Sequence, residues 1–347
     1  MPKATAKADI RYEFDAKPEP GKTLPVGDGT AWLRMPLPFA LNHINLWILR
    51  DTGGWAVVDT GLGDDASRAH WQALFVSTLK NEPVKRVLVT HMHPDHVGCA
   101  GFLTEAFDAS LWMTREEYLY CRVLVADTGR AAPAEGIAFY RAAGYPEAAL
   151  ERYRRMFGYF GRYVTPLPES YHRLRDGQRL AIDGSDWEVI VGRGHSPEHA
   201  CLYNADSGLL IGGDQLLPSI SANVSVYPTE PAANPLAEWL ESLAAIRKRV
   251  PADVLVLPAH GRPYRGAHER IDELQAEHHT RLAALLDCCA TPKRAIDTFP
   301  ALYRRPVTDD NLMFATGEAL AHLNYLAAHG LVTSETDASG VAWYQQA

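Results

Sequence analysis

The sequence predicts a fold of the α/β class, in which buried strands alternate with helices. Short apolar runs, such as residues 87–89 and 254–257, are typical of buried strands. Residues 65–80 and 235–250 carry apolar side chains at helical spacing, which is typical of helices that cover a sheet. This succession of strands and helices occurs twice along the chain, so we expect two halves of similar build.

The overall composition excludes several classes of protein. The chain has 347 residues, which is enough for one large domain and a smaller one. Its formal net charge of -8 argues against a nucleic-acid partner, and no run of about 18 apolar residues would span a membrane. Residues 1–9 lack the apolar segment of a signal peptide, and the five cysteines show no CxxC spacing. We therefore expect a cytoplasmic protein with reduced thiols and no membrane contact.

The first half begins with residues 1–28, which mix Lys, Pro, Gly and Ala and are expected to form a loose N-terminal arm. A strand is predicted over residues 31–35, before the break at Pro36-Leu37-Pro38. Two apolar runs, 45–50 and 55–58, are joined by a Gly-rich tetrapeptide and predict a β-hairpin. The rest of this half is predicted as one helix and two strands, at residues 65–80, 86–90 and 110–114.

Residues 115–175 differ from both halves, because they are rich in Arg, Tyr, Glu and Ala. We interpret them as a helical insertion that lies over the functional site as a lid. Their aromatic residues at helical spacing are typical of a packed core. An insertion of this kind is also where contacts to a substrate are found, because such segments overhang a site. Both interpretations remain open at this stage.

The second half is predicted to consist of strands at residues 187–191, 201–203, 209–211 and 254–257, with a helix at 235–250. A long polar helix follows over residues 268–287, and we expect its His278 and His279 to face solvent. Short helices and a small β-wing are then predicted within residues 286–347, in an arrangement that resembles a winged-helix domain. Since this segment has no basic run, we expect it to pack on the rest of the chain or to form a homodimer rather than bind DNA.

The residues that carry chemistry are concentrated in Thr90-His91-Met92-His93-Pro94-Asp95-His96-Val97-Gly98, directly after the apolar run 87–89. Imidazoles and a carboxylate so close together suit zinc, manganese or iron. Residues 91 and 93 can point to one side of the chain, and 95 and 96 to the other, which predicts two adjacent metals. The alternative is a His-rich surface loop that holds no metal.

The motif H-x-H-x-D-H after a strand resembles the signature of the metallo-β-lactamase-fold hydrolases. The other motifs of that family stand in the same order here: Asp59-Thr60-Gly61, Gly194-His195-Ser196-Pro197, Gly213-Asp214 and Ala259-His260-Gly261. The resemblance covers residues 30–280 and implies a four-layer αββα sandwich with the ligands at one edge, between two sheets. We therefore expect a catalytic domain at residues 29–285 and a winged-helix-like domain at 286–347.

The resemblance also implies a binuclear metal site that is catalytic rather than structural, because each metal keeps an open face. It implies seven ligands: His91, His93 and His195 for one metal, Asp95, His96 and His260 for the second, and Asp214 as a bridge between both. Two divalent cations are expected, zinc in the first place with iron or manganese as alternatives. They would activate a bridging hydroxide as the nucleophile. We predict that Asp95 takes the proton and passes it to the leaving group.

Four further residues are candidates for roles around the metals. The resemblance implies that Asp59 supports the site by hydrogen bonding, although the residue can also simply end its strand. His199, four residues after His195, is expected to buttress the ligand loop. His43, on a loop before the first hairpin, is a candidate for substrate contact. Tyr203 is a second such candidate, with core packing as the alternative.

Three functions remain open on the sequence. The first is hydrolysis of a small acyl substrate, a thioester or an ester including a lactone, which fits the acidic charge and the aromatic insertion. The second is a single-strand endoribonuclease of the same fold, which needs a basic groove. For that groove the sequence offers a cluster of arginines at positions 152, 154, 155 and 162. The third is a metal-binding protein without catalysis.

Overall fold

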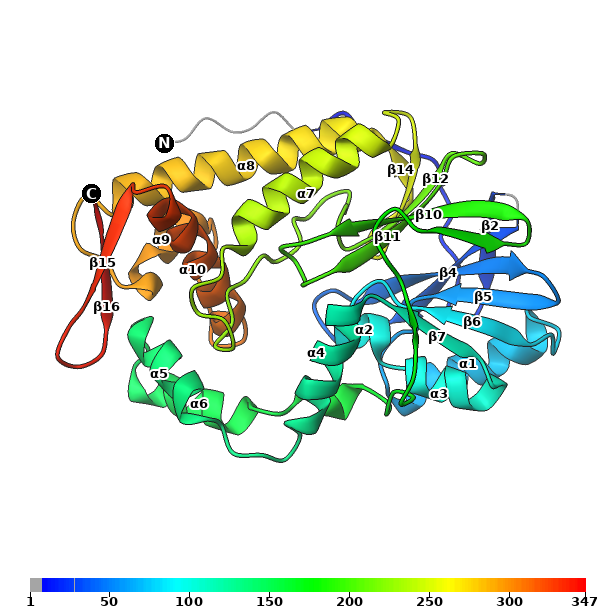
Figure 1. Cartoon of the computed structure of the whole chain (residues 1–347), viewed down its shortest axis with the longest axis horizontal. Coiled ribbons are helices and arrows are strands. Elements are labelled where there is room, and N and C mark those ends of the chain that lie inside the picture. Colours follow the sequence, from blue (N-terminus) through cyan, green and yellow to red (C-terminus); the bar gives the residue numbers. More distant parts are fainter. Residues whose placement is uncertain (1–7, 28) are drawn as a thin grey trace.

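The computed structural model describes residues 8–27 and 29–347. Within these residues the strands form two seven-stranded sheets that pack face to face, with helices on the outer face of each (Figure 1). This arrangement confirms the α/β class and the four-layer sandwich that the sequence predicted. A smaller C-terminal unit lies against the helices of the second sheet (Figure 1).

The first sheet has the order β2-β3-β4-β5-β6-β7-β8. Strands β2 to β5 pair antiparallel, and β5 to β8 pair parallel. Helices α1 (Asp65–Ser77) and α3 (Ala100–Phe107) cover its outer face. The strands are β2 (Thr23–Gly27), β3 (Thr30–Pro36), β4 (His43–Asp51), β5 (Gly54–Val58), β6 (Val84–Leu88), β7 (Ser110–Met113) and β8 (His172–Arg173).

The second sheet has the order β1-β14-β13-β12-β11-β10-β9 and is antiparallel except between β12 and β13. Helices α7 (Pro235–Arg249) and α8 (Ala267–Cys288) cover its outer face. The strands are β1 (Arg11–Tyr12), β9 (Arg179–Ile182), β10 (Ser185–Gly192), β11 (His199–Asn204), β12 (Leu209–Gly213), β13 (Leu255–Pro258) and β14 (Tyr264–Arg265).

The core between the two sheets explains why the strand sequences are almost continuously apolar. Trp32 and Trp47 point into this layer, where their rings stack with centroids 6.2 Å apart. Their neighbours in the chain, Leu33 and Leu46, point to the opposite face and pack beneath α1 and α3. A strand buried on both faces needs apolar residues at successive positions rather than at alternate ones.

The strand directions bring the ligand motifs to one edge of the sandwich. Strand β6 of the first sheet runs into the segment that carries residues 89–93, and the short helix α2 (Pro94–Val97) follows. In the second sheet β10, β12 and β13 run in the same direction and end just before His195, Asp214 and His260. The edge where these strands end therefore receives ligands from both sheets.

The N-terminal arm predicted over residues 1–28 is wrong for the part that the structure describes. Strand β1 pairs with β14 in the second sheet, and β2 pairs with β3 in the first. Residues 1–7 and 28 lie outside the described residues. The prediction failed because the Pro, Gly and Lys content is typical of a loop, whereas the partner of β1 is far away in the sequence.

The insertion is helical, as predicted, but it ends before residue 175. It contains α4 (Arg115–Ala126), α5 (Ala134–Ala142), α6 (Glu147–Met156) and the 3₁₀ helix η1 (Phe160–Tyr163). The chain then returns to the first sheet as β8, which pairs with β7 through Trp112 and His172. Their aromatic rings stack with centroids 4.5 Å apart, which favours this edge pairing.

The C-terminal unit comprises η2 (Ala295–Thr298), α9 (Phe299–Leu302), α10 (Leu312–Ala328) and a hairpin of β15 (Val332–Thr336) and β16 (Ala342–Gln346). Helix α8 runs through the boundary predicted at residues 285 and 286, so one continuous helix joins the two parts. None of the described helices is both long enough and apolar enough to cross a membrane.

The prediction that His278 faces solvent is wrong. Its side chain is buried where α8 meets α10, with its Nδ1 3.2 Å from Nε2 of His322. The sequence could not show this contact, because the polar pattern of residues 268–287 does not reveal that α10 covers one face of the helix.

Candidate metal centre

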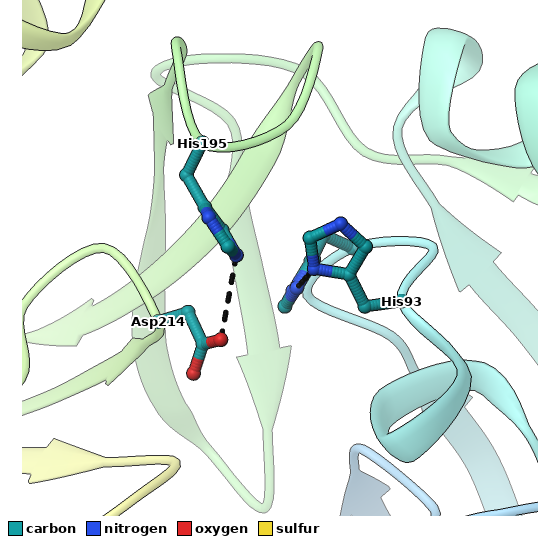
Figure 2. A group of neighbouring side chains, drawn as sticks. His93, His195 and Asp214 are labelled. Carbon is teal, nitrogen blue, oxygen red and sulfur yellow. Dashed lines mark hydrogen bonds and ion pairs between the residues drawn. The ribbon is translucent and has the colours of Figure 1, made fainter. Parts of the chain in front are cut away.

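Two groups of side chains meet at the edge between the sheets. In each group, one nitrogen or oxygen atom of every residue lies within 4.8 Å of those of the others. Figure 2 shows His195 and Asp214 on one side of the first group and His93 on the other. The structure thus brings together all seven side chains predicted as ligands: His91, His93, His195 and Asp214 in one group, and Asp95, His96 and His260 in the other.

Asp214 lies between the two groups and directs one carboxylate oxygen toward each. Its Oδ2 is 3.3 Å from Nε2 of His195, an ion pair drawn in Figure 2. Its Oδ1 is 3.4 Å from Nε2 of His260 and 3.6 Å from Nε2 of His96. A carboxylate placed in this way has the geometry that a ligand shared by two cations requires.

Several buried polar atoms of the centre lack hydrogen-bond partners among residues 8–27 and 29–347: Nε2 of His96, Nε2 of His195 and Oδ1 of Asp214. A buried polar atom without a partner costs about 1–3 kcal/mol. These atoms converge on the same small volume, and Nε2 of His91 also lies only 2.8 Å from Nδ1 of His93. Divalent cations would satisfy all of them, so the residues fit two such ions.

The protonation states of the first group match those of metal ligands. Burial and the neighbouring imidazole of His195 lower the pKa of His93 to about 3. Burial, followed by the charges of His96 and His93, likewise holds the pKa of His91 well below its ordinary value. Both rings are therefore neutral at physiological pH and can donate a lone pair, as ligation requires.

The pKa shifts in the second group and in the shared Asp214 show that its carboxylates attract positive charge. Burial alone would raise the pKa of Asp95 and Asp214, but the imidazoles of His96 and His260 lower both. Conversely, burial would lower the pKa of His96 and His260, yet the two carboxylates raise both. The carboxylates thus hold protons on the imidazoles, and a cation bound there would take over the role of those protons.

Main-chain carbonyl groups fix the orientation of two ligand imidazoles. Nδ1 of His195 donates to the carbonyl oxygen of Asn223 at 2.7 Å. Nδ1 of His260 donates to the carbonyl oxygen of His43 at 2.8 Å. Because a carbonyl oxygen only accepts, each ring must carry a hydrogen on Nδ1, so Nε2 is the atom that faces the centre and would ligate a cation. Such outer hydrogen bonds orient metal ligands and raise their basicity.

The carboxylate of Asp59 fixes the orientation of a third ligand imidazole, that of His96. Its Oδ2 accepts hydrogen bonds from Nδ1 of His96 at 2.8 Å and from the hydroxyl of Thr90 at 2.9 Å, and its Oδ1 accepts from the Thr90 main-chain N–H at 2.8 Å. Asp59 adopts a φ of 62°, in the left-handed region that costs a residue with a side chain about 1–3 kcal/mol. The buried network around its carboxylate keeps the residue in this conformation.

Two more histidines stabilise the ligand loops without joining either group. Nε2 of His199, a fully buried residue, accepts a hydrogen bond from the main-chain N–H of Asp214 at 3.1 Å, which is the buttressing position expected for it. Nε2 of His43 accepts from the N–H of Gly261 at 2.9 Å, and burial and nearby cationic groups lower its pKa to about 4. His43 therefore holds the loop of His260, and its predicted contact with substrate stays a prediction.

Tyr203 is not brought to the centre and is a core residue rather than a substrate contact. Strand β11 begins at His199 beside the centre and runs away from it, so Tyr203 lies near the far end of the strand. Its ring is buried against the helices that cover the second sheet. The sequence showed that Tyr203 was on a strand but not in which direction that strand ran from the site.

Glu117 is a residue of the centre that sequence reasoning missed. The side chain is fully buried on α4, and its two oxygens accept from the main-chain N–H groups of Met92 and Glu198, each at 2.8 Å. Met92 lies between two ligand histidines, and Glu198 follows the loop of His195. One carboxylate therefore connects the ligand loops of the two sheets. The available signal in the sequence was a glutamate that shares its helix with the apolar residues Tyr118 and Cys121.

A cavity of about 510 Å³ opens beside the centre, with His195, Ser196 and Met92 in its wall. The insertion contributes residues of α4, and the other wall comes from the segment 225–238. Charged residues at the cavity are mostly acidic: Glu116, Glu230 and Glu238, with Arg193. The cavity therefore borders the first group of ligands through His195.

Comparison with known proteins agrees with this geometry. Residues 41–261 match the family model described as "Metallo-beta-lactamase superfamily". Residues 282–347 match "Metallo-beta-lactamase-like, C-terminal domain". A crystal structure of a beta-lactamase domain protein from Burkholderia ambifaria is similar, with 43% identity, a TM-score of 0.89, and coverage of 97% of this chain and 98% of that one.

Two curated relatives are more distant. The Bacillus subtilis protein named "Probable metallo-hydrolase YqjP" is 24% identical over 87% of this chain and 93% of its own. A human protein named as an acyl-coenzyme A thioesterase is 25% identical over 54% of this chain and 64% of its own.

Proposed function

Because this chain belongs to the metallo-beta-lactamase superfamily, we propose that it is a binuclear metal-dependent hydrolase of a small acyl substrate. The bond cleaved in this proposal is a thioester or a carboxylic ester, a lactone included. The observation that carries the proposal is the convergence of seven side chains into two adjacent ligand groups, with His195 of the first group in the wall of an open cavity. A structural metal site would instead be closed to solvent.

Two divalent cations, zinc in this proposal, would supply Lewis-acid charge and lower the pKa of a water molecule between the two ligand groups. His91, His93 and His195 would hold one cation, and Asp95, His96 and His260 the other, with Asp214 shared. The side chain of Asp95 remains 20% exposed, so it can exchange protons with solvent.

The proposed reaction is hydrolysis of the bond between the acyl carbon and sulfur or oxygen. The water oxygen forms a bond to the acyl carbon, and the bond from that carbon to sulfur or oxygen breaks. In the proposal, Asp95 accepts the proton that the water loses and delivers it to the departing thiol or alcohol. The products are a carboxylic acid and a thiol or alcohol, so atoms and charge balance without a further reactant.

Charge favours an acyl substrate over RNA, the substrate of the alternative function. Glu116, Glu230 and Glu238 at the cavity would repel a phosphate backbone. Two of the four arginines that the basic groove would need are paired with acidic side chains: Arg152 lies 2.8 Å from Asp310, and Arg154 lies 2.7 Å from Glu147. The relative named as an acyl-coenzyme A thioesterase agrees with acyl chemistry, and the open cavity supports catalysis over simple metal storage.

The test compares two substrates on the zinc-loaded protein: an uncharged thioester of N-acetylcysteamine, chosen because the cavity is acidic, and a single-stranded RNA. We expect hydrolysis of the thioester that a chelator abolishes and that added zinc restores, with no cleavage of RNA. RNA cleavage without thioesterase activity would establish the alternative, and inactivity on both would refute the proposal. In the same assay, Asp95→Asn should lower kcat at full metal occupancy if Asp95 transfers the proton.

A further inference from the structure

A second cavity, of about 600 Å³, lies within the helical insertion and is lined mainly by aromatic and aliphatic side chains. Helices α4, α5 and α6 form most of its wall, and α10 of the C-terminal unit adds Met313. In Figure 1, α5 and α6 lie opposite one end of α10. The apolar wall includes Tyr140, Tyr153, Met156, Phe157 and Tyr227.

This aromatic cavity adjoins the cavity at the metal centre. Tyr120, Val123, Tyr227 and Thr229 line both of them. At this junction the hydroxyl groups of Tyr120 and Thr229 are 2.8 Å apart and hydrogen-bonded, which ties α4 to the segment that follows Asp214. A molecule whose reactive end lies near His195 can therefore extend past Val123 toward the aromatic wall.

Exposed apolar side chains gather around the same path. Leu119, Val123 and Met156 are 52%, 53% and 40% exposed, and each lines one or both cavities. Apolar groups that remain in contact with water in a folded protein mark a binding surface when they lie together. Here Leu119 lines the cavity at the metal centre, Val123 the junction and Met156 the aromatic cavity, so an apolar part of the substrate would cover them.

We propose that the aromatic cavity binds the apolar tail of the acyl substrate, so that the enzyme prefers long or bulky acyl groups to short ones. This inference rests on the proposed function and narrows its substrate class. The acyl carbon lies beside His195, and the tail passes Val123 to contact Tyr140, Tyr153 and Phe157. Burial of each added methylene raises kcat/KM by on the order of threefold until the cavity is filled.

The first test measures kcat/KM of the zinc-loaded full chain on acetyl, octanoyl and dodecanoyl thioesters of N-acetylcysteamine. Val123→Trp obstructs the junction of the cavities from an exposed position on α4. Its matched control is Val76→Trp, the same change at an exposed position of α1 that is 63% exposed and outside both cavities. Met156→Glu, which puts a charge into the aromatic wall, is a second variant should Val123→Trp fold poorly.

We expect kcat/KM to rise at least thirtyfold from acetyl to dodecanoyl in the unaltered protein. Val123→Trp and Met156→Glu should lower the dodecanoyl-to-acetyl ratio at least tenfold, whereas Val76→Trp should leave this ratio within twofold. Equal kcat/KM for all three acyl groups, or the same ratio in Val123→Trp and Val76→Trp, would overturn the inference while the proposed function stands.

The second test measures binding without turnover, by calorimetric titration of the zinc-loaded protein with acetate and dodecanoate. Tighter binding of dodecanoate, weakened at least tenfold by Val123→Trp and not by Val76→Trp, supports the aromatic cavity as the tail site. Equal affinity for the two acids overturns it. If no thioester is hydrolysed, the proposed function has failed, and this titration still decides whether the cavity binds apolar tails.

Discussion

At the scale of single residues, the centre depends on groups that are not themselves ligands. Asp59, Asn223 and the carbonyl of His43 each fix one ligand imidazole, and His199 holds the main chain of Asp214. Glu117 differs from these, because its two oxygens connect loops that belong to different sheets. Its position therefore sets the distance between His91 and His93 on one side and His195 on the other.

Replacing Glu117 by Gln should weaken metal binding more than it weakens the fold. The amide keeps the shape of the carboxylate but can accept with only one of its two polar atoms, so one loop N–H loses its partner. We expect metal affinity to fall at least tenfold, as for other groups that orient metal ligands. Competition with a chelating dye measures this affinity.

The matched control is Glu105→Gln on the exposed side of α3, which should bind metal as the unaltered protein does. Unchanged metal affinity in Glu117→Gln would show that the loops keep their positions without the carboxylate.

Most of the ligand set was predictable at this scale, and the supporting groups were less so. His91, His93, Asp95 and His96 lie within one short stretch, and His195, Asp214 and His260 stand in motifs of the resembled family. In contrast, the Asn223 and His43 contacts use main-chain carbonyl groups, which every residue type possesses. No side-chain pattern can identify an acceptor of that kind.

At the scale of elements, the interface of α8 and α10 contains a buried pair of histidines. Nδ1 of His322 donates to the carbonyl of Glu318 at 2.8 Å, so its Nε2 is free to accept from Nδ1 of His278. Burial holds the pKa of His278 well below its ordinary value and lowers that of His322 to about 4. Both rings are therefore neutral in the folded protein at pH 7.

We predict that this interface loses stability as the pH falls from about 6.5 toward 4. In the unfolded chain His322 regains an ordinary pKa and binds a proton that the folded chain excludes, so acid favours unfolding. With a pKa of about 4 in the folded protein, His322 lowers the free energy of unfolding by on the order of 2 kcal/mol between pH 7 and pH 5. Urea denaturation at the two pH values measures the difference.

His322→Gln removes the titrating group, so its free energy of unfolding should depend less on pH than that of the unaltered protein. An exposed histidine of α8 provides the control, because His279→Gln should leave the pH dependence as it was. Identical pH dependence in His322→Gln and the unaltered chain would contradict the prediction.

The same helix α10 reaches the metal centre through the segment after Asp214. The main-chain N–H of Val226 donates to the carbonyl of Gly317 at 3.0 Å, and a Cβ at Gly317 would come within 2.6 Å of the Ser225 hydroxyl. That segment carries Asn223, which orients His195. The C-terminal unit thus supports a ligand of the centre by packing, which agrees with the expectation that it packs on the rest of the chain.

At the scale of the whole molecule, the metal centre joins the two sheets at their shared edge. His91, His93, Asp95 and His96 follow the first sheet, whereas His195, Asp214 and His260 follow strands of the second. Each ligand group contains residues from both sheets. Cations bound there would therefore hold the halves of the sandwich together as well as supply chemistry.

Removal of metal should accordingly lower the melting temperature of the entire protein. A cation at a hundredfold excess over its Kd stabilises the folded state by about 2.7 kcal/mol, which corresponds to a shift of several degrees in Tm. Calorimetric scans of zinc-loaded and chelator-treated protein measure this shift. Asp214→Asn, which weakens the ligand shared by both groups, should reduce the shift, and an equal Tm with and without zinc would contradict the link between the sheets.

The sandwich was predictable at this scale because its central strands are apolar on both faces and its helices carry apolar residues at helical spacing. The edge strands β1, β8 and β9 and the neighbouring β14 were not, because they are short and are defined by their partners rather than by their own residues. The aromatic residues of the insertion illustrate a further limit. The sequence left open whether Tyr140 and Phe157 belong to the core or to a binding surface, because the cavity that they line depends on how α4, α5 and α6 pack.

The pairing of β1 with β14 has a consequence for how molecules behave toward one another in concentrated solution. Tyr12 and Arg11 occupy the outer side of Tyr264 and Arg265, where an uncovered strand would offer main-chain groups to any passing chain. A variant truncated to begin after residue 12 would expose the unpaired edge of β14 to neighbouring molecules. Such molecules would pair with one another through this strand, so β1 protects the protein against self-association.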